Sequence, residues 1–142
     1  MKWWLSKSAV QFREQVDDNF PDRDRRSDGT LGDARHALKP SSHNPDPKTG
    51  VVRGLDIDAD LRLTKSISID LAEQCRLYAK ADPKKRIEYI IHNAKICSAK
   101  GNWKWRAYKG VNPHKHHIHF TFSPAGDQDS SFFDIPLLGG KV

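Results

Sequence analysis

The sequence predicts one α+β domain in which a small antiparallel sheet is flanked by helices. Two segments carry apolar residues at helical spacing, and several short segments have the alternating or apolar character of strands. No repeat, low-complexity tract or heptad indicates another architecture. The length of 142 residues is common for a single domain, so residues 1–142 are expected to form one domain with one functional site.

Two helices are predicted from the spacing of apolar residues. The first covers residues 8–19 and is stopped by Pro21, and the second covers residues 66–81. Their apolar positions are Val10, Phe12, Val16 and Phe20 in the first helix, and Ile67, Leu71, Cys75 and Tyr78 in the second. Ser66 or Ser68 is available to cap the second helix, which we expect to pack on the sheet.

The first predicted strand, residues 51–59, separates its side chains by chemistry. Because alternate strand residues point to opposite faces, Leu55 and Ile57 would face one side, and Asp56 and Asp58 the other. Further strands are predicted over residues 86–91, 95–97 and 116–122, with an aromatic hairpin or loop over residues 103–108.

A long segment without regular patterning, residues 22–50, separates the first helix from the first strand. It is rich in Asp, Arg, Ser, Gly and Pro, which predicts loops with a short helix near residues 31–38. Loops of this length inside a domain are usually functional or disordered. His36 and His43 lie in this segment.

The balance of charge favours an anionic partner. The chain has 24 basic and 18 acidic residues, for a net charge of +6. Nucleic acid, an acidic membrane surface and an anionic cell wall would each satisfy this charge, because the attraction is long-range and not a specific contact. The charge therefore does not choose among them.

No signal peptide or membrane-spanning segment is predicted. The apolar cluster Trp3-Trp4-Leu5 ends after three residues, whereas a secretory signal needs about 7–15. No apolar stretch approaches the roughly 20 residues that span a bilayer. We therefore expect synthesis in the cytoplasm and no membrane insertion. Cys75 and Cys97 are expected to be buried thiols and not a disulfide.

Histidines are concentrated near the end of the chain. Four of the seven fall within residues 114–119, and on a strand His117 and His119 would project to one side while Ile118 and Phe120 face the core. A solvated polar face or an adventitious metal-binding tract is the plainer interpretation of a histidine pair. The density of this cluster argues against it.

A metal ion bound by this run of histidines would need further ligands from elsewhere in the chain. A catalytic zinc ion usually takes three ligands from His, Asp and Glu and keeps a fourth position for water. His43 and Asp56 are candidates to join His119, in a mixed set that suits zinc and has too few oxygens for calcium. Asp58 competes with Asp56 because both share a strand face; otherwise Asp58 would orient a ligand or remain solvated.

Three motifs in order resemble a family of zinc peptidases. The motifs are Ser41-Ser42-His43, Gly54-Leu55-Asp56 and His114-Lys115-His116-His117-Ile118-His119. They are similar to the Ser-x-His, Gly-x-Ala-x-Asp and late His-x-His pattern of peptidases that include D-alanyl-D-alanine carboxypeptidases and bacteriophage endolysins, with the hedgehog-like zinc fold. The match spans residues 41–119. The Trp-Lys-Trp-Arg-Ala-Tyr-Lys-Gly-Val-Asn-Pro-His segment, residues 103–114, also resembles phage-encoded members.

The resemblance implies a role for each matching residue. His43, Asp56 and His119 would hold one zinc ion. His117 would act beside the metal as general base, and His114 would assist by hydrogen bonding or by stabilising the developing oxyanion. An imidazole suits the base because it titrates near neutral pH, where a zinc-bound water is already nucleophilic.

The chain also departs from the family pattern. His43 and Asp56 are thirteen positions apart, further than the family places its first two ligands, so residues 44–49 are expected to form an inserted loop. His36 lies seven positions before His43 and offers another pairing, although no strand or acid supports it as a ligand. His116 occupies the position at which some members carry an acid, so the base is assigned to His117.

Five further residues are candidates for substrate contacts. Arg53 could bind a substrate carboxylate through both guanidinium nitrogens, although exposed arginines usually only solvate a surface. Trp105 and Tyr108 could form the wall of a groove, as could Trp103, although aromatic residues are more often part of the core. Ser41, from the first motif, would line the same site.

These features predict a zinc-dependent peptidase that hydrolyses an amide bond in the peptide stem of bacterial peptidoglycan. The bond would lie between L-Ala and D-Glu or next to D-Ala, and the enzyme is expected to be a monomer that binds no nucleic acid. The absence of a signal peptide would fit a phage endolysin made in the host cytoplasm, or a lysin carried in the virion.

Two other classes of function remain open from the sequence. A metal-dependent nuclease is suggested by His43-Asn44-Pro45 and the basic charge, but the chain lacks a convincing metal-bearing ββα segment. A non-catalytic zinc-binding module of a cell wall or virion is the other, and the intact base at His117 argues against it.

Overall fold

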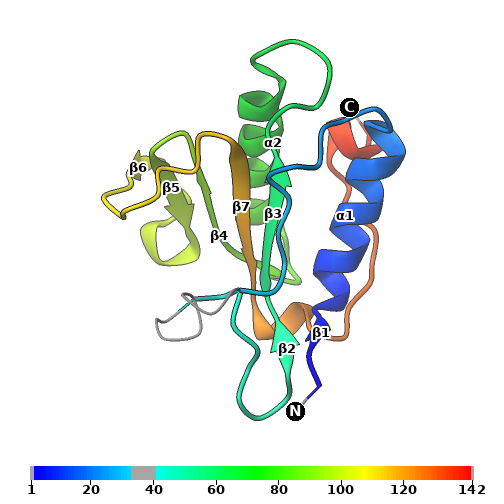
Figure 1. Cartoon of the computed structure of the whole chain (residues 1–142), viewed down its shortest axis with the longest axis vertical. Coiled ribbons are helices and arrows are strands. Elements are labelled where there is room, and N and C mark those ends of the chain that lie inside the picture. Colours follow the sequence, from blue (N-terminus) through cyan, green and yellow to red (C-terminus); the bar gives the residue numbers. More distant parts are fainter. Residues whose placement is uncertain (1, 33–40, 142) are drawn as a thin grey trace.

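A five-stranded antiparallel sheet forms the centre of the structure (Figure 1). The structure is a computed structural model, and it describes residues 2–32 and 41–141. In spatial order its strands are β3 (Gly54–Asp58), β7 (His117–Phe122), β4 (Ile87–His92), β5 (Lys95–Ser98) and β6 (Arg106–Ala107). The antiparallel sheet and two helices confirm the predicted α+β class. The short helix predicted near residues 31–38 lies mostly outside the described residues.

The strand predicted over residues 51–59 is divided into two strands at Arg53. β2 (Val51–Val52) pairs in parallel with β1 (Trp4–Leu5) in a separate two-stranded sheet, and β3 begins at Gly54. The division arises because the backbone N–H of Arg53 donates to the carbonyl of Ser42, at 3.2 Å, and not to a neighbouring strand. Alternation of side chains alone does not reveal such a change of partner.

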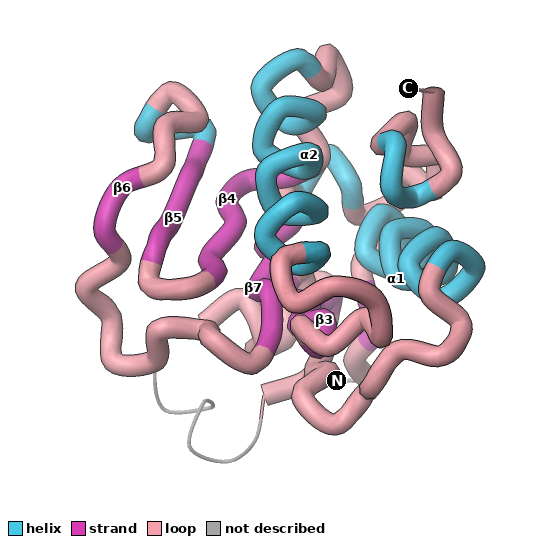
Figure 2. Tube along the Cα trace, turned by 90° about the horizontal axis from the view of Figure 1, so that it is seen from above, coloured by secondary structure: helices cyan, strands magenta, loops and turns pink. Residues whose placement is uncertain are grey.

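Both helices pack on one face of the large sheet. α1 (Lys7–Asn19) places the ring of Phe12 4.5 Å from that of Phe120 on β7. α2 (Ile67–Ala81) contributes Leu71 and Cys75 to the same core, and Figure 2 shows α2 beside the middle strands with α1 next to β3. Cys75 and Cys97 are buried and free, as predicted. Neither described helix is long and apolar enough to cross a membrane.

The buried face of α1 is shifted from the predicted one, and it includes Ser8, Ala9 and Gln15 but not Val10. Val10 is only partly buried, because it lies two residues from Phe12 and projects from another side of the helix. Gln15 is buried instead. Its side-chain nitrogen donates to the carbonyls of Phe133 and Leu138, both at 2.8 Å, which satisfies the buried amide.

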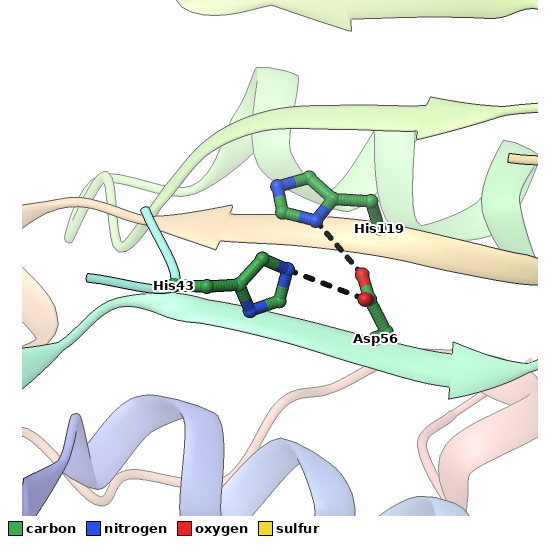
Figure 3. A group of neighbouring side chains, drawn as sticks. All are labelled: His43, Asp56 and His119. Atoms are coloured by element: carbon green, nitrogen blue, oxygen red, sulfur yellow. Dashed lines mark hydrogen bonds and ion pairs between the residues drawn. The ribbon is translucent and has the colours of Figure 1, made fainter. Parts of the chain in front are cut away.

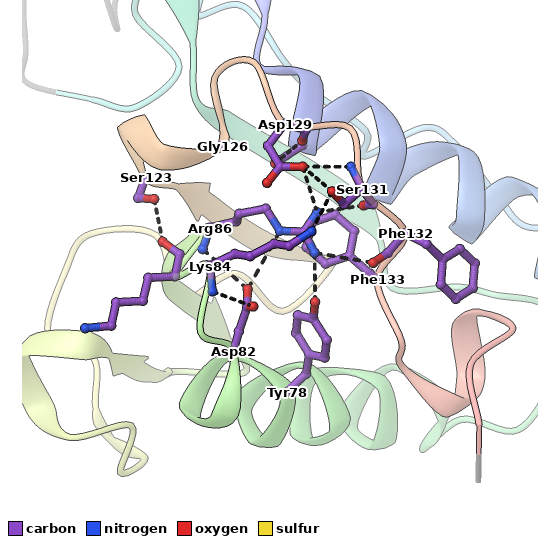
Figure 4. Close-up of polar contacts among 12 residues, drawn as sticks. Tyr78, Asp82, Lys84, Arg86, Ser123, Gly126, Asp129, Ser131, Phe132 and Phe133 are labelled. Atoms are coloured by element: carbon purple, nitrogen blue, oxygen red, sulfur yellow. Dashed lines mark hydrogen bonds and ion pairs between the residues drawn. The ribbon is translucent and has the colours of Figure 1, made fainter.

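A buried guanidinium joins the C-terminal segment to α2 and β4 (Figure 4). Arg86 is 1% exposed, and it donates to the carbonyl of Ser131 at 2.6 Å and to the hydroxyl of Tyr78 at 2.7 Å. The carboxylate of Asp82 lies 3.7 Å from its Nε. The guanidinium carbon lies 3.8 Å from the centre of the Phe133 ring, so this one side chain holds together segments far apart in sequence.

Replacing Arg86 by methionine is expected to lower the free energy of unfolding by about 3 kcal/mol, because the substitution leaves the buried carboxylate of Asp82 without its counter-ion. Arg62→Met is the matched control, since the Arg62 side chain is 55% exposed and its ion pairs lie at the surface. Chemical denaturation of both variants measures the difference. Equal losses in the two variants would contradict the role given to Arg86.

Candidate metal centre

The pairing of β3 with β7 sets two of the predicted ligands opposite each other. Asp56 is the register partner of His119. Ile57 and Phe120, their neighbours along the strands, belong to the core under the helices. Because strand side chains alternate, Asp56 and His119 project from the other face of the sheet. The predicted division of both strands into an apolar and a polar face is therefore correct.

His43 reaches the sheet face of Asp56 and His119 because the segment before it crosses β3 at Gly54. The backbone N–H of Gly54 donates to the carbonyl of Ser42 at 2.9 Å. A Cβ atom at position 54 would lie 2.6 Å from Ser42 Oγ and 2.9 Å from the Ser42 carbonyl carbon, which is closer than real Cβ atoms approach. Only glycine permits this crossing.

The loop predicted over residues 44–49 is a folded turn. One carboxylate oxygen of Asp46 accepts the backbone N–H groups of Lys48 at 2.8 Å and Thr49 at 3.2 Å. Gly50 then takes a φ of 79°, in the left-handed region that favours glycine. The turn returns the chain to β2, so the long sequence separation between His43 and Asp56 does not separate their side chains in space.

His43, Asp56 and His119 form one compact group (Figure 3). The Oδ1 atom of Asp56 lies 2.9 Å from His119 Nδ1, and its Oδ2 atom lies 3.2 Å from His43 Nε2. Ligand atoms of a tetrahedral zinc ion lie roughly 3.3 Å apart, given metal–ligand distances near 2.0 Å. The donor atoms all lie within 4.8 Å of one another, so this group could bind a metal ion with small shifts.

Hydrogen bonds on the far side of each ring orient the two imidazoles. His43 Nδ1 lies 2.7 Å from the carbonyl of Thr30, which can only accept, so Nδ1 carries the proton. His119 Nε2 lies 2.8 Å from Thr121 Oγ1 and 3.3 Å from Ser42 Oγ. A ring that carries a proton on the nitrogen facing Asp56 donates it to the carboxylate. When His43 carries its only proton on Nδ1 and His119 carries its only proton on Nε2, the facing nitrogens direct lone pairs toward the carboxylate, an arrangement that a cation would stabilise.

The electrostatics of the group also suit a cation. Burial alone would raise the pKa of Asp56, but hydrogen bonds and charge from His119 and His43 outweigh it and hold the pKa far below its usual range. Burial lowers the pKa of His119. Burial also opposes the charged form of His43, but the hydrogen bond and charge of Asp56 outweigh it and raise the pKa of that ring. The carboxylate is therefore ionised at neutral pH.

Two further imidazoles face the same carboxylate. His117 Nε2 lies 3.6 Å from Asp56 Oδ2, and His114, His117 and Asp56 form a second group with metal-binding geometry that shares Asp56 with the first. His114 Nδ1 and His117 Nε2 are buried and have no hydrogen-bond partner within residues 2–32 and 41–141. Burial lowers the pKa of His117 and brings that of His114 to about 4, so both rings are neutral near pH 7.

Comparisons with known proteins do not place the chain in a family. No family model, curated protein or solved structure matches it. The chemistry available to the site therefore depends on the donor atoms themselves. Two imidazoles and one carboxylate that converge beside two neutral imidazoles could hold a cation and move protons next to it.

The structure distinguishes Asp56 from Asp58. Asp58 accepts the backbone N–H groups of Ser27 at 2.9 Å and Asp60 at 2.8 Å, so its carboxylate is occupied by loop backbone. His116 is exposed and belongs to neither group that could hold a metal ion. His36 lies outside the described residues.

The five candidates for substrate contacts lie in different places. Arg53 donates to Asp127 at 2.8 and 2.7 Å and to Asp46 at 3.2 Å, so carboxylates of the chain itself already engage its guanidinium. Trp105 donates to Glu73 on α2 at 2.8 Å. Tyr108 lies near the site, with its ring 5.7 Å from that of His114.

Ser41 lies at the other end of the site. Its hydroxyl accepts the backbone N–H of His43 at 3.2 Å. It also lines a groove of about 400 Å³ with Ser42, Tyr89 and Thr121, three residues that contact or stack on His119. The groove therefore begins beside the metal-binding group. Trp103 is buried in the core, as expected of most aromatic residues.

Several residues that shape the site were not predicted from the sequence. Thr121 could have been found, because it lies two positions after His119 and so shares its strand face. Thr30 and His92 could not, because they contact the site only through tertiary structure.

Proposed function

We propose that the protein is a zinc-dependent peptidase with the hedgehog-like fold of the D-alanyl-D-alanine carboxypeptidases and phage endolysins, and that it hydrolyses an amide bond in the peptide stem of peptidoglycan. The observation that carries the proposal is the convergence of His43, Asp56 and His119, which come from three separate segments, beside the neutral rings of His117 and His114. A structural metal site would not require the two additional imidazoles.

The donor set favours zinc among the common metals. Two imidazole nitrogens and one carboxylate match the ligands of catalytic zinc sites, which keep a fourth position open. Calcium and magnesium prefer sites composed of oxygen ligands. Zinc bound here would supply a Lewis acid that activates water and polarises the scissile carbonyl.

The residues of the chain would carry the proton transfers. His117 Nε2 is neutral, buried and aimed at the carboxylate of Asp56, so it accepts a proton from the attacking water and passes it to the leaving amine. His114 lies with its ring 4.8 Å from that of His117 and contributes a hydrogen bond to the developing oxyanion. Thr30 and Thr121 hold the ligand rings in position from behind.

The groove beside His119 would take the peptide stem. Its lining includes Ser41, Tyr89 and Thr121, and it has room for a few residues of extended peptide. The net charge of +6 would draw the enzyme to the anionic polymers of a cell wall. We propose a phage lytic enzyme that acts on the wall after release from the host cytoplasm or from the virion.

Purified protein incubated with cell-wall sacculi is expected to release new amino groups. A chelator should stop the release and added zinc should restore it, because the proposed ligands lose their ion. Plasmid DNA incubated under the same conditions tests the nuclease alternative, and we expect it to remain intact. DNA cleavage without new wall amino groups would overturn the proposal. Bound zinc without activity on either substrate would indicate a non-catalytic binding module.

A further inference from the structure

His92 is a buried histidine that lies outside both metal-binding groups. It is the last residue of β4, 6% exposed, on the sheet face that α2 covers. Its Nδ1 atom lies 2.9 Å from the carbonyl oxygen of His114 and 3.0 Å from that of His117. Its Nε2 atom lies 3.2 Å from the hydroxyl of Ser68 on α2.

Only one tautomer of His92 satisfies all three contacts. Carbonyl oxygens accept hydrogen bonds and cannot donate them, so Nδ1 must carry the proton and share it between His114 and His117. The lone pair of Nε2 then accepts the hydroxyl proton of Ser68. A neutral imidazole with this proton arrangement leaves no atom unsatisfied.

The two carbonyls that His92 engages belong to the residues whose side chains face Asp56. His114 and His117 bound a short loop, so one ring fixes the backbone at both ends of it. His114 has a φ of 57°, a left-handed conformation that a residue with a side chain adopts only when its surroundings hold it.

The β4–β5 turn supports the same loop from the backbone. The N–H of Asn93 donates to the His114 carbonyl at 3.1 Å, and that of Ala94 donates to the Pro113 carbonyl at 2.8 Å. These bonds reach the start of the loop only. The end of the loop is held to β3 by the pairing of His117 with Asp58, and the contact between His92 Nδ1 and the His117 carbonyl adds a side-chain bond from β4.

We propose that His92 is a positioning residue that holds the His114 and His117 imidazoles in working geometry through their backbone carbonyls, which set its tautomer, while Ser68 of α2 bonds its other nitrogen. The inference rests on the proposed hydrolytic function. Because a displacement of about 1 Å at a reacting group can cost roughly 100-fold in rate, loss of the Nδ1 donor should lower kcat without removing the metal.

Two amide variants separate the ring nitrogens. The side-chain nitrogen of asparagine lies near the position of Nδ1, and that of glutamine lies near the position of Nε2. His92→Asn retains a donor toward the two carbonyls, whereas His92→Gln retains only the contact with Ser68. We expect His92→Asn to keep kcat within about threefold and His92→Gln to lose about 10- to 100-fold, with KM little changed and one zinc per chain in both. Both should melt at a similarly lowered temperature.

The possible results distinguish a failure of this inference from a failure of the proposed function. Equal kcat losses in the two variants would mean that His92 only fills space in the core, and would overturn the inference. A wild-type protein that binds zinc but cleaves no wall amide would overturn the proposed function instead. If His92→Gln does not fold, ¹⁵N NMR of the wild-type imidazole decides the question, because a proton on Nε2 in place of Nδ1 would exclude donation to the carbonyls.

Discussion

His119→Ala is expected to abolish stoichiometric metal binding. The substitution removes one of three donors, and it also leaves Asp56 Oδ1 without its nearest partner, 2.9 Å away. Loss of residues that only orient a ligand typically weakens metal affinity by about 10- to 100-fold, so loss of the ligand itself should exceed that. Metal content after dialysis against a dilute chelator measures the effect.

The run of histidines supplies its own control for this variant. His116→Ala makes the same chemical change three positions away, at an exposed side chain. It should retain one zinc ion per chain and wild-type activity. Near-stoichiometric zinc in His119→Ala, or its loss in His116→Ala, would overturn the assignment of ligands. Circular dichroism of both variants distinguishes loss of the ligand from loss of the fold, since His119 is buried.

His117→Ala is expected to keep the metal and lose turnover. The ring contributes a neutral, buried nitrogen 3.6 Å from Asp56 Oδ2, and removal of a general base typically lowers the rate by about 100- to 10,000-fold. Rates of amide release from sacculi at saturating substrate, together with metal content, test both parts of the prediction.

The same measurement distinguishes base from ligand. Because Asp56, His114 and His117 could also hold an ion, His117→Ala would release metal if that group were the main site. Loss of zinc in His117→Ala with retention in His119→Ala would reverse the roles proposed for the two histidines. Loss of turnover alone supports them.

The strand faces of this site could be predicted because they depend on local alternation. Asp56 and His119 project away from the core because Ile57 and Phe120 beside them are apolar and buried. The pairing of β3 with β7, which brings the two together, depends on contacts between distant segments and is not encoded in either strand alone. The resemblance in motif order implied that Asp56 and His119 share an ion but named no strand pairing, and in the structure the two residues are register partners.

The supporting residues could not be predicted for a different reason. Thr30 contributes only its backbone carbonyl, so its side chain gives no signal. Likewise, Arg53 has the character of a surface arginine in sequence, and only the fold reveals that Asp127 and Asp46 already occupy it. The partial exposure of Val10 could not be predicted either. Helical spacing shows which residues lie on the apolar face of a helix, but not which of them lies at the centre of that face.

The segment before His43 crosses β3 at Gly54, so the addition of one methyl group at this position is expected to weaken metal binding. A side chain there would displace the turn that contains Ser42 and His43, while the apolar contacts of β3 under the helices stay in place. A mutation could therefore disable the centre without exposing the core or removing any donor atom. Gly54→Ala should therefore affect the proposed metal centre more than it affects the stability of the fold.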